Sequence, residues 1–113
     1  MHELSLARSI LRIIEQARAQ DPFERVSALR ITVGALAGVE IAALRFGLEA
    51  MAPSTPLAGA RIRIDEIPAR GWCPDCARSV DVRSRLDACG RCGGGLCAVT
   101  GGDALRVAEL TVA

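Results

Sequence analysis

The sequence predicts an α+β fold in which two helices lie on a small three-stranded mixed sheet, with a zinc-ribbon-like domain inserted before the last strand. Two segments show helical apolar periodicity, three show strand-like alternation, and all five cysteines lie in one quarter of the chain. The chain has 113 residues, the size of one ordinary domain, and half of them are apolar. It can therefore bury a core of its own.

Two amphipathic helices are predicted from apolar stripes. Residues 4–20 repeat apolar side chains every three or four positions and end at Asp21-Pro22. Residues 39–51 carry a second stripe, and the prolines that follow prevent its continuation. We expect His2 to precede the first helix. The stripes are Leu6, Ile10, Ile13, Ile14 and Ala17 in the first helix, and Ile41, Leu44, Leu48 and Met51 in the second.

Three strands are predicted from alternation of apolar and polar residues, at 26–33, 60–67 and 104–112. In the first of them Leu29 and Ile31 flank Arg30, as expected of a strand with one buried face. Two helices and three strands can bury their apolar faces against each other.

The composition changes between residues 68 and 102, which hold all the cysteines, the only tryptophan and seven of the eleven glycines. Such a stretch has too few apolar residues to build a core unaided. We therefore expect a zinc-binding domain at 68–102 and an α/β domain formed by 1–67 plus 103–113.

Four cysteines form two C-x-x-C pairs, a spacing typical of a structural zinc site. Each pair can direct two sulfurs at one ion, and four thiolates leave no position for water or substrate. Two disulfides or a redox pair would be the alternative interpretation, although a redox pair usually sits in a βαβ context. The predicted ligands are Cys73, Cys76, Cys89 and Cys92. Cys97 is left over, and we expect it to be a small buried apolar residue.

Charge and hydropathy argue against several functions. Fourteen arginines oppose thirteen acids, a net charge of +1, so a general polyanion binder is not indicated and we expect no nucleic-acid partner. No apolar run is long enough for a membrane span. The N-terminus lacks the pattern of a signal peptide, and its acids argue against a transit peptide, so we expect a cytoplasmic protein.

His2 is the only histidine and would be a weak signal alone. A free α-amine, the His2 amide nitrogen and the imidazole Nδ1 can nevertheless form fused chelate rings around a metal. Such a nitrogen-rich planar set suits Ni(II) or Cu(II) better than zinc.

The order of motifs over nearly the whole chain resembles the HypA/HybF family of hydrogenase nickel-incorporation proteins. The residues that carry the resemblance are Met1-His2-Glu3, Ile31-Thr-Val-Gly-Ala-Leu36, Val39-Glu40, Leu44-Arg-Phe46, Gly59-Ala-Arg-Ile-Arg-Ile64, the two C-x-x-C pairs and Leu105-Arg106-Val107. Gly90 replaces the usual proline of the family, and Ala104 replaces a common acid.

The resemblance implies a metallochaperone that binds Ni(II) through the N-terminal amine, backbone nitrogens and histidine side chain of Met1, His2 and Glu3. Its implied partners are a GTPase of the HypB type and the large subunit of a [NiFe]-hydrogenase. The chain has no phosphate-binding loop of its own and no nucleophile–base pair, so we expect no enzymatic activity. The alternatives are a zinc-ribbon module that binds protein or RNA without a nickel role, and a redox protein.

Overall fold

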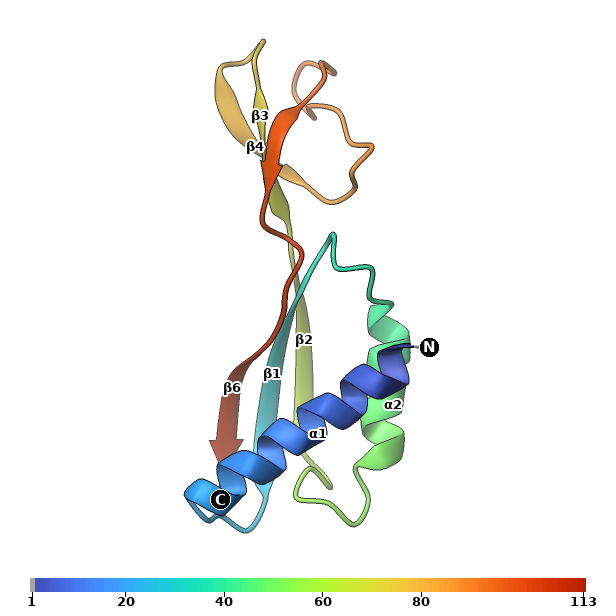
Figure 1. Ribbon diagram of the computed structural model, residues 1–113, viewed down its shortest axis with the longest axis vertical. Coiled ribbons are helices and arrows are strands. Elements are labelled where there is room, and N and C mark those ends of the chain that lie inside the picture. Colours follow the sequence, from blue (N-terminus) through green and yellow to red (C-terminus); the bar gives the residue numbers. More distant parts are fainter. Residues whose placement is uncertain (1) are drawn as a thin grey trace. The chain divides into compact units, whose positions relative to one another are not determined.

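The structure, a computed structural model, describes residues 2–113 and shows an α+β chain with eight regular elements (Figure 1). In chain order they are α1 (His2–Gln20), β1 (Val26–Gly34), α2 (Ile41–Met51), β2 (Arg61–Ile67), β3 (Ala69–Cys73), β4 (Arg78–Val82), β5 (Cys97–Thr100) and β6 (Leu105–Val112). The chain forms two compact units. The first contains residues up to Ile31, Val39–Asp65 and Arg106–Ala113, and the second contains Thr32–Gly38 and Glu66–Leu105.

Helix α1 buries a narrower stripe than the sequence predicted. Ala7, Ile10 and Ile14 are buried, whereas the side chain of Ile13 is 48% exposed. A turn of 3.6 residues places position 13 beyond the edge of the stripe defined by 7, 10 and 14. The helix also starts at His2, so the expectation that His2 precedes it was wrong. It ends near Pro22, and the Nε of Arg18 donates to the Phe23 carbonyl at 2.7 Å.

The first sheet has the strand order β2-β1-β6 and is mixed, as predicted. Hydrogen bonds from Ala113 to Arg25 and from Gly34 to Ala104 join opposite ends of β1 and β6, which is an antiparallel arrangement. Strand β2 returns to β1 through α2, the crossover that a parallel pair requires. The buried apolar residues of the first unit come from β1, the two helices and the loop before β2. They include Ala7, Ile10, Ile14, Val26, Leu29, Ile31, Leu44, Leu48 and Leu57.

Helix α2 is capped by acidic side chains at its N-terminus. The Glu40 carboxylate accepts a hydrogen bond from the Ala42 amide at 3.2 Å, the usual function of an N-cap residue. The Glu40 amide in turn donates to the carboxylate of Glu3 at 3.0 Å. This second bond ties the first turn of α1 to the start of α2.

The second sheet, with the order β4-β3-β5, was not predicted from the sequence. Strand β3 pairs antiparallel with β4 and with β5. Its buried face carries only small residues, Ala69, Gly71 and Cys73, while Arg70 and Trp72 are exposed. An alternation of small residues gives almost no hydropathy signal, because the pattern depends on large apolar side chains.

Two glycines allow backbone segments of the second unit to pack closely. The Gly34 amide donates to the Ala104 carbonyl at 2.7 Å, and the Leu36 amide donates to the Gly102 carbonyl at 2.6 Å. A Cβ at Gly34 would lie 2.1 Å from the Gly102 oxygen. Only glycine fits at this position. No helix among residues 2–113 has the length and hydropathy needed to cross a membrane.

Candidate metal centre

The four predicted zinc ligands come together in the second unit, on two tight turns. Cys73 ends β3 and Cys76 lies in the turn that leads to β4, whereas Cys89 and Cys92 lie in the loop between β4 and β5. All four Sγ atoms lie within 4.8 Å of one another. Residues far apart in the sequence therefore converge on one point, as the C-x-x-C spacing predicted.

The distances between the sulfurs fit a tetrahedral ion. Four sulfurs at about 2.3 Å from a zinc ion would lie about 3.8 Å from one another. The Sγ atoms of Cys73 and Cys92 are 3.5 Å apart, and those of Cys76 and Cys89 are 3.9 Å apart. Both distances exceed the roughly 2.05 Å of a disulfide bond, and all five cysteines are free thiols. The arrangement suits a structural zinc ion.

Backbone amides also point at the sulfurs. The Cys76 amide donates to the Cys73 sulfur at 3.4 Å, and the Gly94 amide donates to the Cys92 sulfur at 3.3 Å. The amide bond from Gly94 favours the Cys92 thiolate, but the hydrogen bond with the Cys73 thiol and desolvation outweigh it, and the pKa of Cys92 is raised. Both turns require left-handed backbone just after the second cysteine, where φ is 52° at Ala77 and 75° at Gly93.

The thiols differ strongly in acidity. Hydrogen bonds from the backbone amides of Cys92 and Arg91 lower the pKa of Cys89 to about 7. A hydrogen bond with the Cys92 thiol, followed by desolvation, raises the pKa of Cys76 to about 12. Four thiolates this close would repel one another, so the cluster favours a mixture of charged and neutral groups. A divalent cation would remove the repulsion and release the remaining protons.

Cys97 lies outside the cluster, at the start of β5 opposite Trp72. Its side chain is exposed, so the prediction that it is buried was wrong. Strand β5 is exposed throughout, and Ala98 has a positive φ of 52° that interrupts the pairing with β3.

Two of the three predicted nickel ligands, His2 and Glu3, lie at the start of the first unit, whereas Met1 lies outside the described residues. The exposed His2 begins α1, and its Nε2 is 3.7 Å from the carboxylate of Glu3. The amide hydrogen bond from Glu40 is the main cause that lowers the pKa of Glu3 below its usual value. This bond could not be predicted from the sequence, because it joins two residues 37 positions apart.

The fold and the cysteine cluster together define a small α+β metal-binding protein with a centre of the zinc-ribbon type. Comparison with known proteins gives a narrower assignment. The model of the family described as "Hydrogenase/urease nickel incorporation, metallochaperone, hypA" matches residues 1–112. The chain belongs to this family.

Relatives and solved structures agree with the assignment. The hydrogenase maturation factor HypA of Polaromonas naphthalenivorans is 47% identical over 113 residues, which cover all of this chain and 98% of the relative. That of Azotobacter vinelandii is 45% identical over 112 residues and 99% of both chains. The solution structure of the Ni metallochaperone HypA from Helicobacter pylori has the same fold, with a TM-score of 0.66 at 16% identity over 99% of this chain and 97% of that chain.

Proposed function

We propose that the protein is a nickel metallochaperone for the maturation of [NiFe]-hydrogenase. The observation that carries this proposal is the family match over residues 1–112, which includes the Met1-His2-Glu3 start. Nickel is the cargo in this proposal. It is bound by the Met1 amine, the backbone nitrogens of His2 and Glu3, and the His2 imidazole.

The geometry of the first helical turn supports this ligand set. The imidazole of His2 is exposed and accessible to a metal. The first four amides of a helix have no intrahelical acceptor, so the nitrogens of His2 and Glu3 can coordinate without breaking the helix. The Glu3 carboxylate accepts the Glu40 amide, which supports a role for the residue 3 backbone rather than its side chain.

The cysteine cluster has a different role in the proposal. Cys73, Cys76, Cys89 and Cys92 would hold a zinc ion that shapes domain 68–102, while nickel is handled by the domain of residues 1–67 plus 103–113. A closed four-sulfur site supplies no open position for chemistry. The protein is then a carrier without enzymatic activity, and it works in the cytoplasm with a GTPase of the HypB type and the hydrogenase large subunit.

Nickel titration by calorimetry tests the chelate. A protein that starts at Met1 should bind one equivalent, whereas a protein extended by Gly-Ser before Met1 should bind far more weakly because its amine has become an amide. His2→Ala should cause a similar loss, and a C-terminal tag is the matched control. Equal affinity of the extended and native proteins would overturn the nickel site and favour a zinc-ribbon interaction module.

Zinc analysis tests the second metal. Serine at any of the four ligand positions should abolish stoichiometric zinc and loosen residues 68–102, because the metal replaces a missing core. Cys97→Ala should keep one zinc per chain, because its thiol lies outside the cluster. Loss of zinc in the Cys97 variant would mean that the ligand set is wrong.

A further inference from the structure

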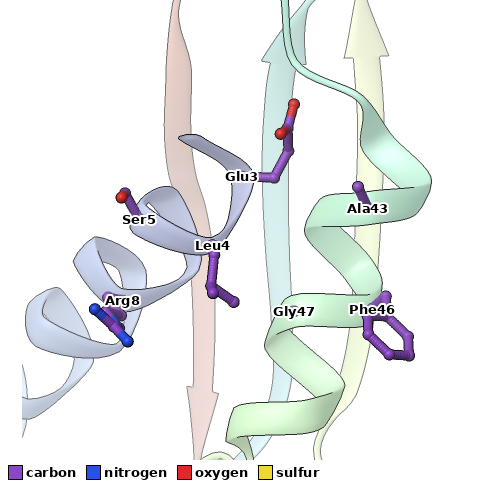
Figure 2. Close-up of a pocket in the computed structure, with 7 residues that line it drawn as sticks. All are labelled: Glu3, Leu4, Ser5, Arg8, Ala43, Phe46 and Gly47. Atoms are coloured by element: carbon purple, nitrogen blue, oxygen red, sulfur yellow. The ribbon is translucent and has the colours of Figure 1, made fainter. Parts of the chain in front are cut away.

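An apolar groove lies beside the start of α1. It has a volume of about 510 Å³ and runs between the first turns of α1 and the exposed side of α2. Figure 2 shows Leu4 projecting from α1 toward α2, next to the position where Gly47 has no side chain. The lining residues are Glu3, Leu4, Ser5, Arg8, Ala43, Phe46 and Gly47.

Two large apolar side chains of this groove face solvent. Phe46 is 73% exposed and Leu4 is 50% exposed, although the chain has only three aromatic residues. Burial would remove both from water at little conformational cost, and aromatic residues are enriched at the centres of protein interfaces. Neither is needed for the core, whose contribution from α2 is Leu44, Gly47 and Leu48.

The groove has an acidic residue, Glu3, at one end and a basic residue, Arg8, at the other. Glu3 and Arg8 lie on either side of Leu4 along α1, and Figure 2 shows their side chains directed away from each other. The Glu3 carboxylate already accepts the Glu40 amide and lies 3.7 Å from His2. None of the ion pairs formed within residues 2–113 includes Arg8, so its guanidinium is available to an external carboxylate.

We propose that this groove docks a peptide segment of the protein that receives the nickel. The segment carries a large apolar side chain between Leu4 and Phe46 and a carboxylate at Arg8. Because the Glu3 end repels acids, the charges fix the direction of the segment and leave its uncharged end beside His2. The proposal rests on the proposed function, since it is proximity to the nickel ligands that makes the acceptor the occupant.

Binding to the purified precursor of the hydrogenase large subunit, measured by biolayer interferometry, tests the groove. Phe46→Ser and Leu4→Ser should each weaken binding by about thirty-fold, the size of a hot-spot loss. Ile13→Ser is the matched control, because Ile13 is equally exposed on α1 but does not line the groove. Arg8→Glu should weaken binding by about ten-fold or more, whereas Arg85→Glu changes the net charge identically outside the groove and should have no effect.

Nickel affinity separates the groove from the metal site. Phe46→Ser should bind nickel like the native protein but deliver it more slowly, whereas His2→Ala should bind the precursor normally without carrying nickel. The proposal is overturned if the Phe46 and Arg8 variants bind the precursor as tightly as the native protein. It is also overturned if they lose only self-association in light scattering, which would make a second copy the occupant, or lose only GTPase binding.

Discussion

A methyl group added at position 34 should strongly destabilise the second unit. The new Cβ of Gly34→Ala would lie 2.1 Å from the Gly102 carbonyl oxygen, whereas real Cβ atoms essentially never approach another atom within 3.0 Å. The backbone would have to move by about 1 Å, and no flexible side chain is available to move instead. Both hydrogen bonds at this crossing, from Gly34 to Ala104 and from Leu36 to Gly102, would be strained or lost.

The expected loss in the free energy of unfolding is the sum of two contributions, the two weakened hydrogen bonds and the steric overlap. Each backbone hydrogen bond contributes about 1 kcal/mol net, and overpacking costs a further 1–3 kcal/mol or so. The free energy of unfolding should therefore fall by about 3–5 kcal/mol, a large share of the roughly 5–15 kcal/mol typical of a domain. With a slope of about 2 kcal/mol per molar urea, the midpoint should fall by about 2 M.

The chain offers separate probes for its two units. Trp72 is the only tryptophan and lies on β3 in the second unit, so its fluorescence follows that unit in urea. Both helices lie in the first unit, so the far-ultraviolet circular dichroism signal follows the unfolding of the first unit. Gly95→Ala is the matched control, because its Cβ would meet nothing within 4 Å and its φ is not positive. An unchanged fluorescence midpoint for zinc-loaded Gly34→Ala would refute the reasoning.

Three further predictions concern the metal centre and the first helical turn. The pKa of Cys89 is about 7, so the ultraviolet thiolate absorbance of the metal-free protein should rise in a step through about pH 7. The Cys89→Ser variant should lack this step, and a step that persists in the variant would assign it to another thiol. Gly93→Ala should destabilise the zinc-loaded protein by about 1 kcal/mol in urea, because φ there is 75°, whereas Gly90→Ala should be neutral. The pKa of Glu3 is lowered by folding, so its stabilising effect is complete above about pH 4.5 and is lost as the pH falls through the lowered value. The melting temperature, followed by helical circular dichroism, should fall with acidification in the native protein and fall less in Glu3→Gln. Identical dependence of the melting temperature on pH in the two proteins would contradict this role of Glu3.

The regular elements that bury large apolar residues could be predicted from the sequence. The stripe of α2 and the alternation of β1 were confirmed within one or two residues, because Leu, Ile and Val dominate the two patterns. Strands β3, β4 and β5 could not be predicted, because they are short and the buried face of β3 carries Ala, Gly and Cys.

The convergence of the four cysteines could be predicted from the sequence for a different reason. The C-x-x-C spacing reports a local turn, and two such turns suffice to place four sulfurs within 4.8 Å. The burial of Cys97 was predicted wrongly, because apolar neighbours in sequence do not show which face of an edge strand meets solvent. The groove at Leu4 and Phe46 was missed, because its walls come from two helices whose packing the sequence does not specify.

Under the proposed function, the hydrogen bond between Glu3 and the Glu40 amide implies that nickel and zinc would be acquired at different thermodynamic cost. The first turn of α1 is already anchored to α2, so nickel bound there would spend little of its affinity on ordering the protein and could be released without unfolding it. The four thiols are not all ionised until a cation binds, so the affinity for zinc would be partly free energy of folding. A preorganised cargo site and a metal-organised scaffold site can therefore coexist in one small chain, and exchange of one metal need not disturb the other.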